Sequence, residues 1–177
     1  MKRHIEISAC AQQILEALPR GILLNTNGDK FNAMVIGWGA LGVVWGVPAF
    51  TVYVRQGRYT RAQLDSTGEF TLSIPLEKPD PAINRVCGMQ SGRDIDKAAL
   101  AGLTPEPPEV NHTPGVREYP LTLECQVLYS RPQEPDRLPD DLRERMYPRD
   151  VDGTAPLANW DAHVAYIGKI VSAYVIE

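Results

Sequence analysis

The stretch FNAMVIGWGALGVVWGVPAFTVYVR, residues 31–55, decides how this chain is interpreted. It has no charged residue before its final Arg55, and a run of ~20 apolar residues is long enough to span a membrane as a helix. Four glycines and a proline interrupt the run, however, and its Val and aromatic residues favour strands. We therefore expect two buried strands, 31–38 and 49–55, joined by a glycine-rich connection, and no membrane span.

Composition and charge narrow the class of protein. The 177 residues carry a net charge of −4 without any long block of Lys or Arg, which argues against a nucleic-acid partner. Cys10, Cys87 and Cys125 lie far apart, outside any CxxC or Cys/His ligand spacing, so we expect reduced, buried thiols and no metal site. Acidic and amide residues interrupt the first apolar run, which does not fit a secretory signal. The chain is expected to be cytoplasmic.

Several local patterns predict secondary structure before residue 76. Residues 5–18 should contain a helix, with Ser8 as a possible cap, that stops before Pro19. Asn27-Gly28 lies between two apolar runs and predicts a β-hairpin. Thr60 and Gln63 have capping-box spacing and Gly68 is a stop signal, so they predict a helix over 60–68, followed by a strand over 69–75.

The rest of the chain alternates short helices, a loop and long strands. Helices should begin at Asp80-Pro81 and at Asp94, a proline-rich covering loop should run over 104–120, and residues 138–147 should form a surface helix. Residues 121–131 alternate as a half-buried strand, and 160–177 are too long for one regular strand, so Gly168 should mark a bend. About seven strands with inserted helices predict an antiparallel barrel with α additions.

Two clusters of cations and hydroxyl groups are candidate anion sites. Arg55, Arg58, Tyr59, Thr60 and Arg61 lie where a strand meets the start of a predicted helix, and free helical N–H groups with nearby guanidinium groups suit an anion. A solvated strand end is the alternative. The second cluster precedes the helix expected at Asp94, and two such clusters in an acidic chain suit a phosphate monoester. Its members are Ser91, Gly92, Arg93 and Lys97.

These stretches together resemble a known family. Residues 32–55, 58–75, 87–105 and 163–171, in this order, are similar to the flavin reductase-like, FMN-binding split-barrel proteins, and most of all to the flavoredoxin subgroup. The resemblance implies a mainly β fold: an antiparallel, Greek-key-like FMN-binding split barrel with short helices inserted, forming one domain over 1–177. It also implies a homodimer with FMN near the subunit interface.

The resemblance further implies roles for individual residues. The isoalloxazine and ribityl side would be lined, largely through backbone groups, by Asn32, Ala33, Met34, Val35, Ile36 and Trp38. Arg55, Tyr59 and Thr60 would hold the phosphate, with the second cluster closing over it. His163 would lie near the flavin or the nicotinamide, and no essential acid or base is expected because the cofactor carries the chemistry. A core role for Trp38 and a structural role for His163 remain as alternatives.

Three functions are open at this point. The first is an FMN-dependent oxidoreductase that takes a hydride from NADH or NADPH, between which the sequence does not choose because it has no strand–GxGxxG–helix fingerprint. The second is a flavoredoxin-like electron carrier that serves a protein redox partner. The third is a split-barrel module for another anionic ligand, such as haem.

Overall fold

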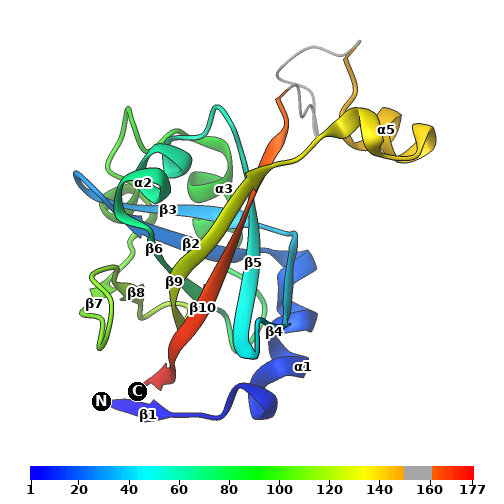
Figure 1. Ribbon diagram of the computed structural model, residues 1–177. Coiled ribbons are helices and arrows are strands. Elements are labelled where there is room, and N and C mark those ends of the chain that lie inside the picture. Colours follow the sequence, from blue (N-terminus) through cyan, green and yellow to red (C-terminus); the bar gives the residue numbers. More distant parts are fainter. Residues whose placement is uncertain (150–160) are drawn as a thin grey trace.

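The chain folds around one antiparallel sheet that curls into an open barrel (Figure 1). The computed structural model describes residues 1–149 and 161–177. The strands follow the order β3-β2-β6-β9-β10-β5-β4, and β1 pairs with the far end of β10. Their bounds are β1 Lys2–His4, β2 Ile22–Asn27, β3 Phe31–Ile36, β4 Gly39–Val44, β5 Val47–Arg55, β6 Glu69–Ile74, β9 Leu121–Pro132 and β10 His163–Ile176.

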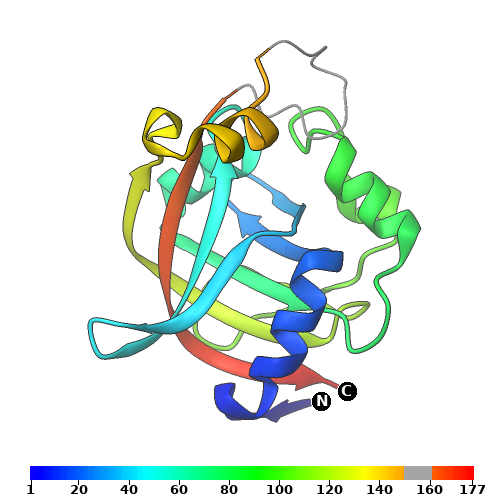
Figure 2. The ribbon, with the colours of Figure 1, turned by 90° about the vertical axis from the view of Figure 1, so that its right-hand side faces the viewer.

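The barrel is split between β3 and β4. These two strands form opposite edges of the sheet, although only Gly37 and Trp38 separate them in the chain. The predicted antiparallel barrel is confirmed, and its split lies beside the stretch that decided the sequence interpretation. Figure 2 shows α1 (Ile7–Ala17) lying along the open side of the barrel.

The core fills the barrel with the inward-facing residues of every long strand. Ile22, Leu24, Phe50, Val52, Phe70, Leu72, Leu123 and Cys125 belong to it and are fully buried. All three cysteines are buried and free, as expected. A smaller cluster lies on the other side of β2 and β3, beneath α3 (Pro81–Met89) and α4 (Lys97–Ala101).

The predicted connection over 39–48 is wrong, because most of it is strand β4. This strand forms a hairpin with β5 through a two-residue turn, in which Trp45 has φ 50° and Gly46 φ 77°. Positive φ at both positions is the geometry of the tight turns that suit a twisted hairpin. The strand escaped prediction because it alternates weakly and most of it is half-buried or exposed.

The helices near the N-terminus begin earlier than expected. Helix α1 starts at Ile7, so Ser8 is its second residue and no side chain caps it. It ends before Pro19, which lies in the short 3₁₀ turn η1 (Leu18–Arg20). Helix α2 (Tyr59–Thr67) ends at the left-handed Gly68, as predicted, but the Thr60–Gln63 capping box is wrong because Arg58 occupies the N-cap.

The later helices are confirmed, with one correction. Asp80 caps α3 by accepting a hydrogen bond from the N–H of Ala82, as the Asp80-Pro81 signal predicted. The helix expected from Asp94 begins only at Lys97, because it is the carboxylate of Asp96 that accepts the capping bond. The surface helix is α5 (Asp140–Met146), preceded by η2 (Pro135–Arg137).

The proline-rich segment covers the outer face of β6 and β9, as predicted for 104–120. It contains the short pair β7 (Pro105–Glu106) and β8 (Gly115–Val116). Under this cover Thr122 and Glu124 are buried too, so the first half of β9 is buried on both faces rather than half-buried. Strand order alone does not reveal such a cover.

The last strand bends where it was expected to. Strand β10 pairs with both β5 and β9, and its register against β9 shifts between Ile167 and Gly168. A Cβ at Gly168 would lie 2.5 Å from the ring of Phe70, so the close approach requires glycine. The structure describes the predicted segment only from Asp161, and Trp160 lies outside the described residues.

Candidate functional site

A cavity of about 630 Å³ opens at the split of the barrel, where β3, β5 and β10 meet. Its size lies in the range of ~300–1,000 Å³ that is typical of small-molecule sites. The lining combines apolar and backbone surface from β3 with three basic side chains. The lining includes six residues to which the resemblance gave a role at the flavin: Met34, Val35, Ile36, Trp38, Arg55 and His163. Arg58, from the first anion cluster, also lines it, whereas Pro19, Gly37 and Tyr53 were not expected there.

Aromatic side chains form one wall of this cavity. The ring centroids of Trp38 and His163 lie 4.8 Å apart at an angle of 42°. Trp38 is half-buried and lies outside both core clusters, so the alternative that it is a core residue does not hold. The hydroxyl of Tyr147, just after α5, lies 2.8 Å from Nδ1 of His163.

His163 is an uncharged base at neutral pH. Its side chain is buried, and burial together with the nearby Arg55 lowers its pKa from 6.5 to about 4. A neutral imidazole can stack against a flat ring and hydrogen bond through one nitrogen while Tyr147 occupies the other. The arrangement fits a neighbour of a ligand, and it also contains the structural bond that the sequence left as an alternative.

Arg55 has a partner of its own in the protein. It lies opposite His163 in the β5–β10 register, and its Nε donates to Oδ1 of Asp161 over 2.5 Å. Burial raises the pKa of Asp161, but the bonds from Gly57 N–H and from Arg55 outweigh it and leave the pKa below its usual value. Arg55 therefore keeps its side chain fixed at the cavity wall, half-buried instead of solvated at a free strand end.

Arg58 belongs to the first candidate anion cluster of the sequence analysis, although the family resemblance gave it no role at the phosphate. It lines the cavity, and within residues 1–149 and 161–177 its guanidinium makes no hydrogen bond or ion pair. Burial and the neighbouring Arg55 lower its pKa. A half-buried, partnerless cation suits an anionic ligand. Arg58 is the N-cap residue of α2, so it lies beside the N–H groups of the first helical turn, which have no partner within the helix.

The start of α2 gathers a second group of expected residues. Asn32 donates to Oγ1 of Thr60 over 2.9 Å, and a Cβ on Gly92 would lie 2.0 Å from Oδ1 of Asn32. Oδ1 of Asn32 is buried without a partner in the described chain. The guanidinium of Arg93 lies 6.0 Å from the ring centroid of Tyr59. Residues far apart in the sequence thus meet at the open N-terminus of one helix, next to Arg58.

Three expected residues do not face this group. Lys97 is buried and donates two bonds of 2.9 Å, to the carbonyls of Ala33 and Cys87, so it supports β3 from behind. Burial lowers its pKa from 10.5 to about 8. Ala33 is fully buried, and Ser91 is exposed with its hydroxyl accepting from the N–H of Arg93.

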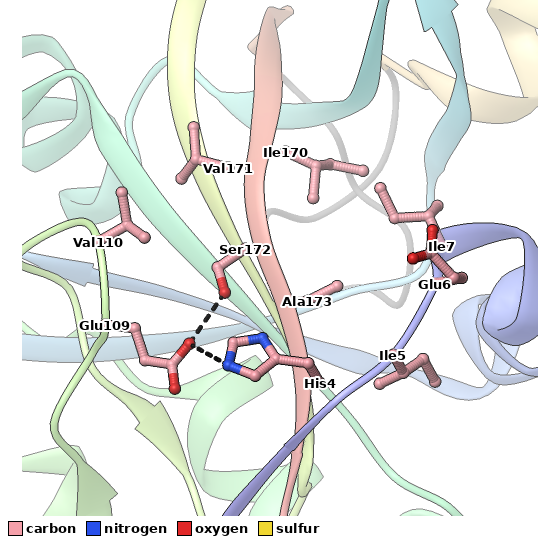
Figure 3. Close-up of a pocket in the computed structure, with 10 residues that line it drawn as sticks. All are labelled: His4, Ile5, Glu6, Ile7, Glu109, Val110, Ile170, Val171, Ser172 and Ala173. Atoms are coloured by element: carbon pink, nitrogen blue, oxygen red, sulfur yellow. Dashed lines mark hydrogen bonds and ion pairs between the residues drawn. The ribbon is translucent and has the colours of Figure 1, made fainter.

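Another concavity lies at the far end of the barrel, between β1, β10 and the covering loop (Figure 3). Glu109 accepts a hydrogen bond from Ser172 over 3.1 Å, and His4 lies 3.4 Å from the same carboxylate oxygen. Its polar groups therefore satisfy one another. The cavity at the split differs, because it has an aromatic wall, lies next to the start of α2 and contains a cation, Arg58, without a partner among the described residues. These features fit a ligand with a flat ring and a phosphate.

A family comparison gives these features a context. The family model described as "Flavin reductase like domain" matches residues 15–177. The chain belongs to the flavin reductase-like domain family. The match includes every strand of the sheet except β1, together with every residue named at the cavity.

Solved structures of flavin reductase-like proteins share this fold. Flavoredoxin of Desulfovibrio vulgaris (Miyazaki F) is 24% identical with a TM-score of 0.64, covering 89% of this chain and 69% of that one. The FMN-binding domain of a flavin reductase-like enzyme from Shewanella baltica OS155 is 15% identical with a TM-score of 0.66, covering 99% and 77%. The NADH:FAD oxidoreductase of Streptomyces globisporus C-1027 is 14% identical with a TM-score of 0.61, covering 88% and 75%. They establish the split-barrel fold.

A search of curated proteins found none that matches this chain. Among the residues that the structure describes, no helix has the length and apolar character needed to cross a membrane.

Proposed function

We propose that the cavity at the split binds FMN and that the protein is a flavin reductase-like oxidoreductase, which passes a hydride from NADH or NADPH to the flavin. The observation that carries the proposal is Arg58, a half-buried cation without a hydrogen bond or ion pair in the described chain, between a ring-sized cavity and the open start of α2. Family membership supports it.

The residues divide between the two ends of the cofactor. The backbone of 32–36 and the ring of Trp38 would line the isoalloxazine and ribityl side. Arg55, Tyr59 and Thr60 would hold the phosphate with Arg58, while Gly92 and Arg93 would close over it beside Ser91. Lys97 would act indirectly, since it holds the carbonyl of Ala33 and hence the position of β3.

FMN, when bound, supplies the hydride chemistry. The protein would then contribute position and a dry environment. Trp38 and Ile36, which line the cavity, would exclude water from one face of the ring, and the neutral His163 would donate or accept one hydrogen bond without adding charge beside it. No side chain has to act as an essential acid or base.

A second candidate is an FMN electron carrier that exchanges electrons with a protein partner. Its support is the likeness to flavoredoxins of D. vulgaris and Methanosarcina acetivorans, each 24% identical. Anaerobic mixing of the FMN-loaded protein with NADH or NADPH separates the candidates. Rapid bleaching and turnover with free flavin favour the reductase, whereas a flavin that only a reduced protein partner bleaches favours the carrier.

Titration with FMN tests whether the cavity at the split binds this cofactor. Arg55→Ala should weaken FMN binding by about 1.5–3 kcal/mol, the range for hydrogen bonds to charged groups. Arg85→Ala, at an exposed position on α3, should leave the affinity unchanged. A wild-type protein without flavin absorbance, whose thermal unfolding added FMN does not shift, would refute FMN binding.

We also propose a homodimer of single-domain chains, acting in the cytoplasm. The support is the β4–β5 hairpin, which projects from the barrel (Figure 2). At its tip Val43 and Trp45 are 74% and 65% exposed, and Trp45 contacts the half-exposed ring of Tyr129. An exposed Trp held at positive φ is costly, which favours a contact role. Sedimentation of wild type and Trp45→Ser tests it: the variant should dissociate more readily.

A further inference from the structure

A second cavity of about 370 Å³ lies next to the one at the split, under α5. The two share Gly37, Trp38 and Tyr53, so the ring of Trp38 lies between them. Four apolar side chains form most of the remaining wall: Leu18, Leu138, Leu142 and Met146. The site assignment above does not use this space.

Among the residues that the structure describes, the lining of the α5 cavity carries no charged side chain. Arg55, Arg58 and His163 all line the neighbouring cavity instead. Moving an ionised group into such surroundings without a partner has a large free-energy cost. The α5 cavity therefore suits an uncharged compound and does not suit a phosphate or a carboxylate. Its volume, at the lower end of ligand sites, fits a small ring.

A polar edge breaks the apolar wall at Gln133 and Tyr147. The hydroxyl of Tyr147 lies 3.2 Å from Oε1 of Gln133 and 2.8 Å from Nδ1 of His163. In the described chain the amide Nε2 of Gln133 donates no hydrogen bond. An amide N–H that faces a cavity can serve a carbonyl oxygen, since it has two protons to donate.

We propose that the α5 cavity binds a small, uncharged ring compound that bears a carbonyl group, alongside the flavin cavity. The ring packs against Trp38 and the leucines, and the carbonyl oxygen accepts a hydrogen bond from Gln133. Occupation of the α5 cavity does not depend on FMN, because the charged groups that would hold FMN lie on the other side of Trp38.

Calorimetric titration of three probes into the flavin-free and the FMN-loaded protein tests this site. The probes are acetophenone, ethylbenzene and benzoate. Acetophenone should bind both forms at least about tenfold more tightly than benzoate, a difference of ~1.4 kcal/mol. Equal binding of benzoate would overturn the assignment of an uncharged site. Because the flavin-free protein is titrated too, the binding of acetophenone can be measured even if the protein does not bind FMN.

Two variants locate the binding. Leu142→Trp fills the α5 cavity and should weaken acetophenone binding at least about tenfold while FMN affinity stays within about twofold. The matched control is Leu100→Trp, at an exposed position on α4 that lines neither cavity, and it should change neither affinity. If Leu142→Trp leaves acetophenone unaffected, or weakens FMN equally, the α5 cavity is not a separate site.

Gln133→Leu keeps the shape and removes the amide. It should lower the preference for acetophenone over ethylbenzene at least about fivefold, because only the ketone can accept the hydrogen bond. An unchanged preference would remove Gln133 from the site. Circular dichroism and thermal unfolding of each variant confirm that its fold is retained before it is titrated.

Discussion

Two regions of this molecule bury charged groups in opposite ways. Under the covering loop, the fully buried carboxylate of Glu124 accepts four hydrogen bonds, from three backbone N–H groups and from the hydroxyl of Tyr174. At the split of the barrel, Arg58 is half-buried with no such bond in the described residues. Glu124 is satisfied by its own chain, whereas Arg58 has no such partner among the described residues.

The difference separates structural from functional burial. A charge that is fully hydrogen-bonded fixes two segments together, here the loop 109–111 and β9. A charge without partners adds no such link and has a desolvation cost, which the anionic ligand proposed above would offset. Buried uncharged groups do not differ between the two regions in this way. Oδ1 of Asn25, beneath the loop, and Oδ1 of Asn32, at the candidate site, both lack partners in the described chain.

The largest effect is expected at Glu124. Glu124→Gln turns an amide N–H₂ toward groups that donate hydrogen bonds, so at least two buried donors lose their acceptor. The free energy of unfolding should fall by roughly 3–5 kcal/mol. Urea unfolding followed by circular dichroism measures it. A loss below about 1 kcal/mol would show that the loop does not depend on this carboxylate.

The next effect comes from His163 and depends on pH. Its folded pKa of about 4 lies below the unfolded value of 6.5, so the unfolded chain takes up a proton first on acidification. The contribution of the neutral His163 to the free energy of unfolding is therefore fully present above pH 6.5. It is lost as the pH falls from 6.5 toward 4, and the loss amounts to about 3 kcal/mol. His163→Gln should lack this loss between pH 6.5 and 4.

Thermal unfolding across that pH range compares the two proteins, and His112→Gln is the control. The side chain of His112 is 88% exposed. Its replacement should leave the acid profile like that of the wild type. If the unfolding temperature depends on pH in the same way for wild type and His163→Gln, the folded protein takes up the proton on His163 as readily as the unfolded chain, and its pKa is not lowered.

A smaller effect should separate binding from stability at Arg58. Arg58→Met should weaken FMN binding by about 1.5–3 kcal/mol and leave the free energy of unfolding unchanged or higher, because the cation loses no protein partner. Fluorescence titration with FMN and urea unfolding give the two numbers. Lower stability with normal FMN affinity would reverse the assignment and make Arg58 structural.

The smallest effect is expected at Glu118, also on the covering loop. Its carboxylate is only half-buried and accepts from a single donor, the N–H of Thr104. Glu118→Gln keeps one acceptor oxygen, so stability should change by about 1 kcal/mol or less. A loss as large as that of Glu124→Gln would show that burial of the carboxylate is not what distinguishes the two positions.

The sequence by itself determined the elements whose signals are local. The stop at Gly68 rests on a left-handed backbone conformation and the bend at Gly168 on a close approach, and both favour glycine. The Asn27-Gly28 signal correctly predicted the hairpin of β2 and β3, although neither residue has positive φ and residues 28–30 connect the strands. The barrel followed from counting alternating strands. The closeness of Arg55, Tyr59 and Thr60 also followed, because all three lie within six residues of chain.

Tertiary structure decided the features that depend on distant partners. Strand β4 exists because β5 pairs with it, although most of its residues are half-buried or exposed. Lys97 was expected at a phosphate and instead bonds the carbonyl of Ala33. Asp161, more than a hundred residues away in the chain, forms a hydrogen bond and an ion pair with Arg55 but not with Arg58. The partner of each charged side chain depends on contacts between residues far apart in the sequence, and the local sequence does not determine these contacts.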